Sequence, residues 1–70
     1  MPIFLAPLNV EVKVLKVLTD EKTKKHLESL GITISSTLVV LSSNSGGVVV
    51  LVKDGRLALD KNISSKIFVA

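Results

Sequence analysis

The chain has one histidine, His26, and imidazole is the side chain that most readily binds metals or moves protons near neutral pH. It lies in the segment KTKKHLESLGI, residues 22–32. A metal site of useful affinity needs three or four protein ligands, and the chain supplies one His, no Cys and six Asp or Glu. Glu28 is two residues away and points elsewhere on a helix. We therefore expect His26 to be a boundary side chain and expect no intrachain metal site, which leaves open a weak site shared between two copies.

The hydroxyl groups suggest no catalytic arrangement. Eight Ser, one His and no Cys provide no recognisable pair of nucleophile and base, so we expect no catalytic residue and no enzyme activity. The Gly-rich stretch from Ser42 to Gly47 lacks the Gly and Lys spacing of a phosphate-binding loop and precedes a strand-like run. We interpret it as a long, mobile hairpin connection.

The net charge of +3 and the pI near 9.5 are compatible with nucleic-acid binding. Single-strand binders usually present aromatic side chains beside their cations, and this chain has only two Phe, both inside apolar runs. The one basic cluster is Lys22, Lys24 and Lys25. We interpret it as a solvated helix face and expect no nucleic-acid partner.

Length and composition predict one domain, residues 1–70, with an aliphatic core. Apolar residues form 47% of the chain, with eleven Val, eleven Leu and five Ile, which favours sheet. No basic residue precedes the apolar start, which carries two prolines, so we expect no signal peptide. No apolar run approaches the roughly 20 residues of a membrane-spanning helix. The expected location is cytoplasmic, without direct membrane insertion.

The first half of the chain predicts a strand and then a helix. VEVKV, residues 10–14, alternates strictly and places Val10, Val12 and Val14 on one face. The parity changes afterwards, which predicts a bulge or bend around Leu15 to Val17. A helix of about three turns follows, with Thr19 or Asp20 as its N-cap and Gly31 as its stop.

The strongest local signal is the hairpin VVVLVKDGRLALD, residues 48–60. Asp54-Gly55 between two apolar runs predicts a two-residue type I′ turn. The resulting register is Lys53 opposite Arg56, Val52 opposite Leu57, Leu51 opposite Ala58, Val50 opposite Leu59 and Val49 opposite Asp60. Val50, Val52, Leu57 and Leu59 then form the core face.

The other face of this hairpin carries an apolar strip with a cationic end. Its residues, which we take as candidate partner-binding residues, are Val49, Leu51, Lys53, Arg56 and Ala58. Either the N-terminal MPIFLAPL covers this strip, or the strand is buried on both sides of a twisted barrel, or the strip docks a protein partner. The residues alone leave these alternatives open.

Strands near Thr37–Leu41 and Lys66–Ala70 complete the expected architecture. The fold class is mainly β, a small SH3-like, partly open barrel of five antiparallel strands with one short α-helix.

This pattern resembles the FeoA family, ferrous iron transport protein A, from about Leu5 to Val69. The resemblance rests on the helix end HLESLGIT, on the loop with Gly46 and Gly47, and on VVVLVKDGRLALDKNISSKIFV. The family often has Arg at the position of His26, so His26 is not expected to be a family metal ligand.

The resemblance implies a small cytoplasmic accessory protein of ferrous iron transport that docks on the cytoplasmic part of FeoB, the membrane transporter with a GTPase domain. It implies no required cofactor and at most weak binding of Fe²⁺ or Zn²⁺. The alternatives are a stand-alone SH3-like module for peptides or proteins and a detached sensory domain of an iron-dependent regulator. The missing aromatic residues disfavour the peptide-binding module. The oligomeric state is not indicated.

Overall fold

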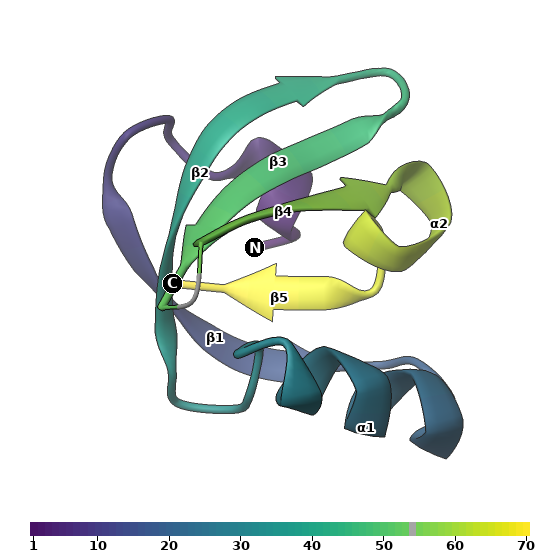
Figure 1. Cartoon of the computed structure of the whole chain (residues 1–70). Coiled ribbons are helices and arrows are strands. Elements are labelled where there is room, and N and C mark those ends of the chain that lie inside the picture. The colour runs from purple at the N-terminus through teal and green to yellow at the C-terminus, as the bar shows by residue number, and fades with distance from the viewer. Residues whose placement is uncertain (54) are drawn as a thin grey trace.

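Five antiparallel strands form one sheet in the order β4-β3-β2-β1-β5 (Figure 1). The computed structural model describes residues 1–53 and 55–70. In chain order the elements are the 3-10 helix η1 (Ile3–Leu5), β1 (Glu11–Val17), α1 (Glu21–Ser29), β2 (Thr37–Asn44), β3 (Gly47–Val52), β4 (Gly55–Asp60), α2 (Lys61–Ser64) and β5 (Ile67–Val69). The margins of the sheet, β4 and β5, do not pair with each other, which confirms the predicted partly open barrel.

β1 shows the predicted alternation and the predicted bulge. Val12, Val14 and Val17 are buried, and the pairing with β5 shifts register between Val14 and Lys16. The extra residue, Leu15, is therefore turned outward and is 47% exposed. The prediction for Val10 is wrong, since it precedes the strand and is 50% exposed. The chain turns at Asn9, which has φ 62° and donates its N–H to the Val40 carbonyl at 2.8 Å, so regular pairing starts only afterwards.

α1 begins and ends where the sequence predicts. The Asp20 carboxylate accepts the Thr23 N–H at 2.9 Å and so acts as the N-cap. Gly31 has φ 101°, a left-handed backbone conformation that ends the helix and that glycine adopts more readily than other residues. Leu27 is buried among the core side chains, and Leu30 is half-buried. The helix thus contacts the core through one narrow stripe formed by Leu27 and Leu30.

The connection between β2 and β3 is shorter than predicted. The ladder continues to the pair Asn44 and Gly47, so only Ser45 and Gly46 form the turn. The Asn44 side chain accepts the Gly46 N–H at 2.7 Å, which stabilises the tight turn. The predicted long, mobile connection over Ser42–Gly47 is therefore wrong, because the polar residues Ser42 to Asn44 extend the strand.

The β3–β4 register is displaced by two residues from the prediction. The observed pairs are Val52–Gly55, Leu51–Arg56, Val50–Leu57, Val49–Ala58, Val48–Leu59 and Gly47–Asp60. Gly55 is thus the first residue of β4 and not part of the turn; Asp54, the other predicted turn residue, lies outside the described residues. A shift of two preserves the side-chain alternation, so the predicted core face is retained: Val50, Val52 and Leu59 are buried and Leu57 is half-buried.

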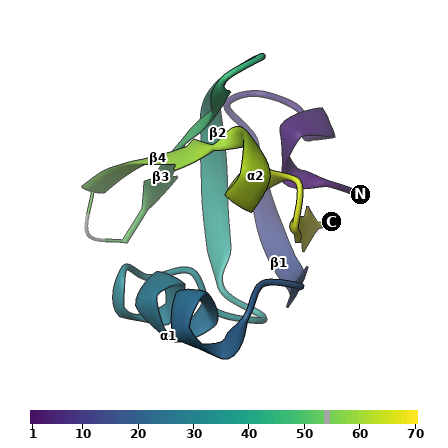
Figure 2. The ribbon, with the colours of Figure 1, turned by 90° about the vertical axis from the view of Figure 1, so that its right-hand side faces the viewer.

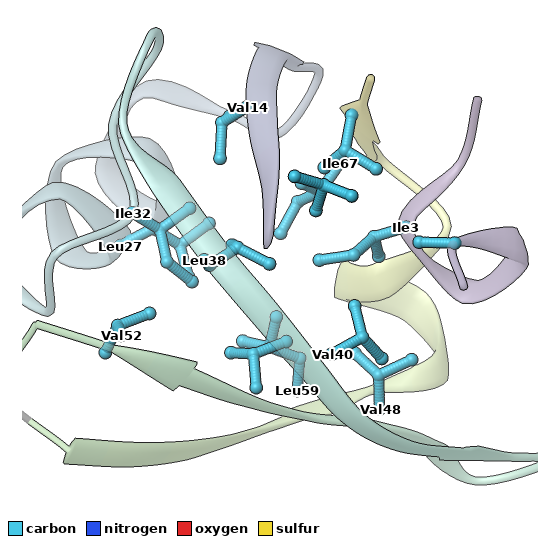
Figure 3. Packing of buried hydrophobic residues seen from close by; sticks show 14 of the residues in the cluster. Ile3, Val14, Leu27, Ile32, Leu38, Val40, Val48, Val52, Leu59 and Ile67 are labelled. Carbon is cyan, nitrogen blue, oxygen red and sulfur yellow. The ribbon is translucent and has the colours of Figure 1, made fainter. Parts of the chain in front are cut away.

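The core fills the space enclosed by the sheet (Figure 3). Ile3, Ile32 and Ile67 are among its fully buried members, as are Val14 and Val40. Figure 2 shows α1 at one end of the barrel and η1 toward the opposite end, where it contacts β2, β3 and β5. α2 links β4 to β5 and is capped by Asp60, whose carboxylate accepts the Ile63 N–H at 2.8 Å.

Candidate docking surface

The outward face of the sheet carries a row of four side chains across four strands. In the ladders, Glu11 lies opposite Val39, Val39 opposite Leu51, and Leu51 opposite Arg56. Directly opposed residues in antiparallel strands point to the same face. Val12, Leu38, Val50 and Val52 point into the core, so this row must point outward. Leu51, at the centre of this row, is 43% exposed.

A second outward pair extends the apolar strip. Val49 lies opposite Ala58, one step further along β3 and β4. Val49 is half-buried and Ala58 is exposed. Both residues border a shallow depression together with Gly46 of the β2–β3 turn and Gly47, the first residue of β3. The four predicted residues Val49, Leu51, Arg56 and Ala58 therefore share one face, as expected, although their cross-strand partners differ from the prediction.

Lys53 joins this surface from the end of β3. It is exposed and borders a second depression together with Leu51, Val39, Glu11 and Thr37. The row thus has cations at its β3–β4 end and a carboxylate at its β1 end. Such a surface favours a partner that supplies apolar contacts at its centre and opposite charges at its two ends.

The structure rules out two of the alternatives that the sequence leaves open for this face, and the third, docking of a protein partner, stays a prediction. The segment MPIFLAPL does not cover it, because η1 inserts Ile3 into the core while Leu51 and Ala58 stay exposed. The Phe4 carbonyl accepts the Ser43 hydroxyl at 3.3 Å, which holds η1 beside β2. Burial on both sides of the strand is likewise wrong for Leu51.

His26 lies on the surface and is more exposed than the boundary position that the sequence predicts. It is exposed near the end of α1, and its carbonyl accepts the Ser29 hydroxyl at 2.6 Å. Over residues 1–53 and 55–70, no three His, Cys, Asp or Glu side chains gather where they could hold a metal ion. Within the same residues, no helix has the length and apolar character to cross a bilayer.

Two members of the row, Val39 and Glu11, are absent from the sequence-based candidates. Their outward parity could have been inferred from the alternation of TLVVL and of VEVKV. Their position beside Leu51 could not, because it depends on the β2–β3 register. That register is set by the Ser45-Gly46 turn and by the shift between Val40 and Ser42.

Comparisons with known proteins agree with this fold. The sequence model described as "FeoA domain" matches residues 1–70. A crystal structure of an iron uptake regulatory protein (FeoA) superimposes with a TM-score of 0.85 at 24% identity, covering 99% of this chain and 93% of the other. The solution structure of the FeoA protein from Chlorobium tepidum gives a TM-score of 0.83 at 19% identity, covering 99% of this chain and 68% of the other. No curated protein matches the sequence. The chain therefore belongs to the FeoA family, whose members have a role in ferrous iron transport.

Proposed function

We propose that this protein is a non-enzymatic accessory subunit that docks on the cytoplasmic part of a FeoB-like ferrous-iron transporter. The observation that carries the proposal is the outward row centred on Leu51, an exposed leucine flanked by Val39 and Arg56. Contiguous apolar side chains rimmed by charges mark interaction sites on small domains. Membership of a ferrous iron transport family indicates the kind of system in which the partner lies.

The proposed contact is made by side chains on rigid strands. Val49, Leu51 and Ala58 supply the apolar centre, and Lys53 and Arg56 attract an acidic rim on the partner. Because the backbone that carries Val49, Leu51, Arg56 and Ala58 is fixed by ladder pairing on β3 and β4, little conformational entropy is lost on docking. The proposed role is regulatory, and no group of this chain takes part in chemistry.

An amide NMR titration tests the proposal. The ¹⁵N-labelled protein is titrated with the soluble, GTPase-containing domain of the transporter in the presence of GDP and, separately, of a GTP analogue. Shifts concentrated on Val49, Leu51, Arg56 and Ala58 are expected. Shifts confined to α1, or no shifts with either the GTPase-containing domain or the detergent-solubilised full transporter, would show that this face is not the docking site.

A further inference from the structure

The two margins of the sheet differ in whether the chain itself covers them. At β5, the Met1 amino group donates to the Val69 carbonyl at 2.9 Å, the Val69 N–H donates to the Met1 carbonyl at 2.8 Å, and Pro2 pairs with Phe68. The N-terminal residues thus act as an added strand segment. At β4, no strand of the described chain pairs with the outer edge. An uncovered edge strand presents unpaired backbone groups to another chain.

The backbone groups at the open edge can be assigned to particular residues. In an antiparallel ladder, alternate residues direct N–H and C=O toward the neighbouring strand or away from it. The two-residue turn Ser45-Gly46 closes on the hydrogen-bonded pair Asn44–Gly47, so alternate residues of β3 from Gly47 to Leu51 bond toward β2. The residues between them, Val48, Val50 and Val52, therefore bond toward β4, where their partners are Leu59, Leu57 and Gly55. Arg56 and Ala58 therefore direct their backbone groups outward from the sheet.

β4 also has few of the features that protect edge strands. The sequence GRLALD contains no Lys, no Pro and no inward-facing charge, and its register with β3 is continuous over six pairs. Leu57 is only half-buried at this margin although it packs against the core. The edge thus combines open backbone groups with apolar surface that a further strand would cover.

We propose that β4 pairs with β4 of a second copy of this chain, antiparallel and with the two-fold axis at Ala58. The side-chain order of the strand is self-complementary in this register. Arg56 faces Asp60 of the second copy on the outer face, and does so twice because of the symmetry. Leu57 faces Leu59 of the second copy on the core side. The two Ala58 residues face each other at the axis, where a small side chain allows close approach.

Because the β5 edge is covered and the β4 edge is open, a two-fold dimer is favoured over a head-to-tail assembly. A head-to-tail assembly would pair β4 with β5 of the next copy, and that edge is occupied by Met1 and Pro2. Joining two open edges about a two-fold axis leaves no open edge and closes at a dimer. The inference goes beyond the proposed function, because it concerns pairing at the edge of β4 and can be tested without any partner, although Arg56 and Ala58 also belong to the proposed docking surface.

A single-cysteine cross-link provides the sharpest test, because the natural chain has no cysteine. In the proposed register the two residues 58 are directly opposed, with Cα atoms about 5.5 Å apart, within disulfide range. The matched control Arg56→Cys lies on the same exposed face of β4, but the two residues 56 would be roughly 14 Å apart. Under mild oxidation we expect Ala58→Cys to form a covalent dimer as its main product and Arg56→Cys to remain mostly monomeric.

Sedimentation equilibrium of the uncross-linked protein provides a second readout. Arg56→Glu places like charges opposite Asp60 and should weaken self-association about tenfold, whereas Arg56→Lys should retain it. Arg56→Glu with Asp60→Asn removes the repulsion while keeping an N-cap residue for α2, and should recover part of the loss. Circular dichroism confirms that each variant is folded.

Two results would overturn the proposal. One is a wild-type chain that stays monomeric at millimolar concentration, and the other is equal cross-linking at positions 56 and 58.

Discussion

Leu51 and Arg56 are direct cross-strand partners on the outward face of β3 and β4. An exposed leucine and a guanidinium therefore occupy one row, and Val39 continues that row on β2. Neighbouring β-strands lie about 4.8 Å apart, so the apolar and cationic groups form a single small contact surface.

Leu51→Asp should weaken docking strongly without unfolding the domain. The side chain is 43% exposed, so its replacement removes little core packing but puts a charge at the centre of the proposed contact. Loss of a central apolar contact of about 2 kcal/mol corresponds to roughly 30-fold weaker binding. The measurement is the affinity for the transporter's GTPase-containing domain by calorimetry.

Leu18→Asp is the matched control for that experiment. Leu18 is 57% exposed and follows β1, outside the row. Its substitution should leave the affinity unchanged. Equal losses in both variants would show that binding responds to general surface polarity, and the docking assignment to this row would then be wrong.

Ile67→Ala should destabilise the domain strongly. Ile67 on β5 has 0% exposure and contacts the centre of the core, so truncation leaves a cavity in a small protein. The expected loss in free energy of unfolding is about 2–5 kcal/mol, measured by urea denaturation. Ile34→Ala, at a side chain that is 49% exposed, should change it by no more than about 0.5 kcal/mol.

Gly47→Ala should prevent the β2–β3 turn from closing as it does in the native protein. Gly47 has φ 139°, and an added Cβ would collide with the Leu59 carbonyl oxygen on the neighbouring strand. Because that oxygen belongs to the backbone of β4, relief requires the strands to separate. We expect the midpoint temperature of thermal unfolding to fall much further for Gly47→Ala than for Gly46→Ala, because the Cβ added at residue 46 would meet only the Asn44 side chain. Similar midpoints for the two variants would contradict this account of the turn.

The N-cap of α1 should make stability depend on acid pH. The hydrogen bond from Thr23 to the Asp20 carboxylate lowers the pKa of that group below its usual value, so the folded state favours the charged form. This stabilisation is present above the unfolded pKa of about 3.9 and is lost as pH falls through the lower folded pKa. Thermal unfolding of wild type and Asp20→Asn between pH 6 and pH 2 should therefore show a larger acid loss in the wild type. Parallel pH profiles would mean that Asp20 does not contribute in this way.

Metal binding by the isolated chain should be weak and confined to the surface. His26 is exposed and, within the described part of the chain, belongs to no group of three ligating side chains. Anaerobic calorimetry with Fe²⁺ and with Zn²⁺ should show no saturable one-to-one binding at micromolar protein, and His26→Ala should behave like the wild type. Tight one-to-one binding of either ion would show that this expectation is wrong.

The sequence by itself determined the elements whose signals are local. Asp20 and Gly31 mark the ends of α1 because capping depends on neighbouring backbone groups, and the parity change at Leu15 predicted the bulge in β1. Alternation along VVVLVKDGRLALD assigned the core and outward faces correctly. These features depend on residues within a few positions of one another, so the pattern alone carries them.

Tertiary structure decided which residues face one another. A two-residue slip between β3 and β4 keeps every side chain on its face, so periodicity could not distinguish Leu51–Ala58 from the observed Leu51–Arg56 pair. The position of Val39 beside Leu51 and the cover that Met1 provides over β5 depend on contacts between distant parts of the chain. Only the folded sheet, through its backbone ladder, selects one register among those that bury the same side chains.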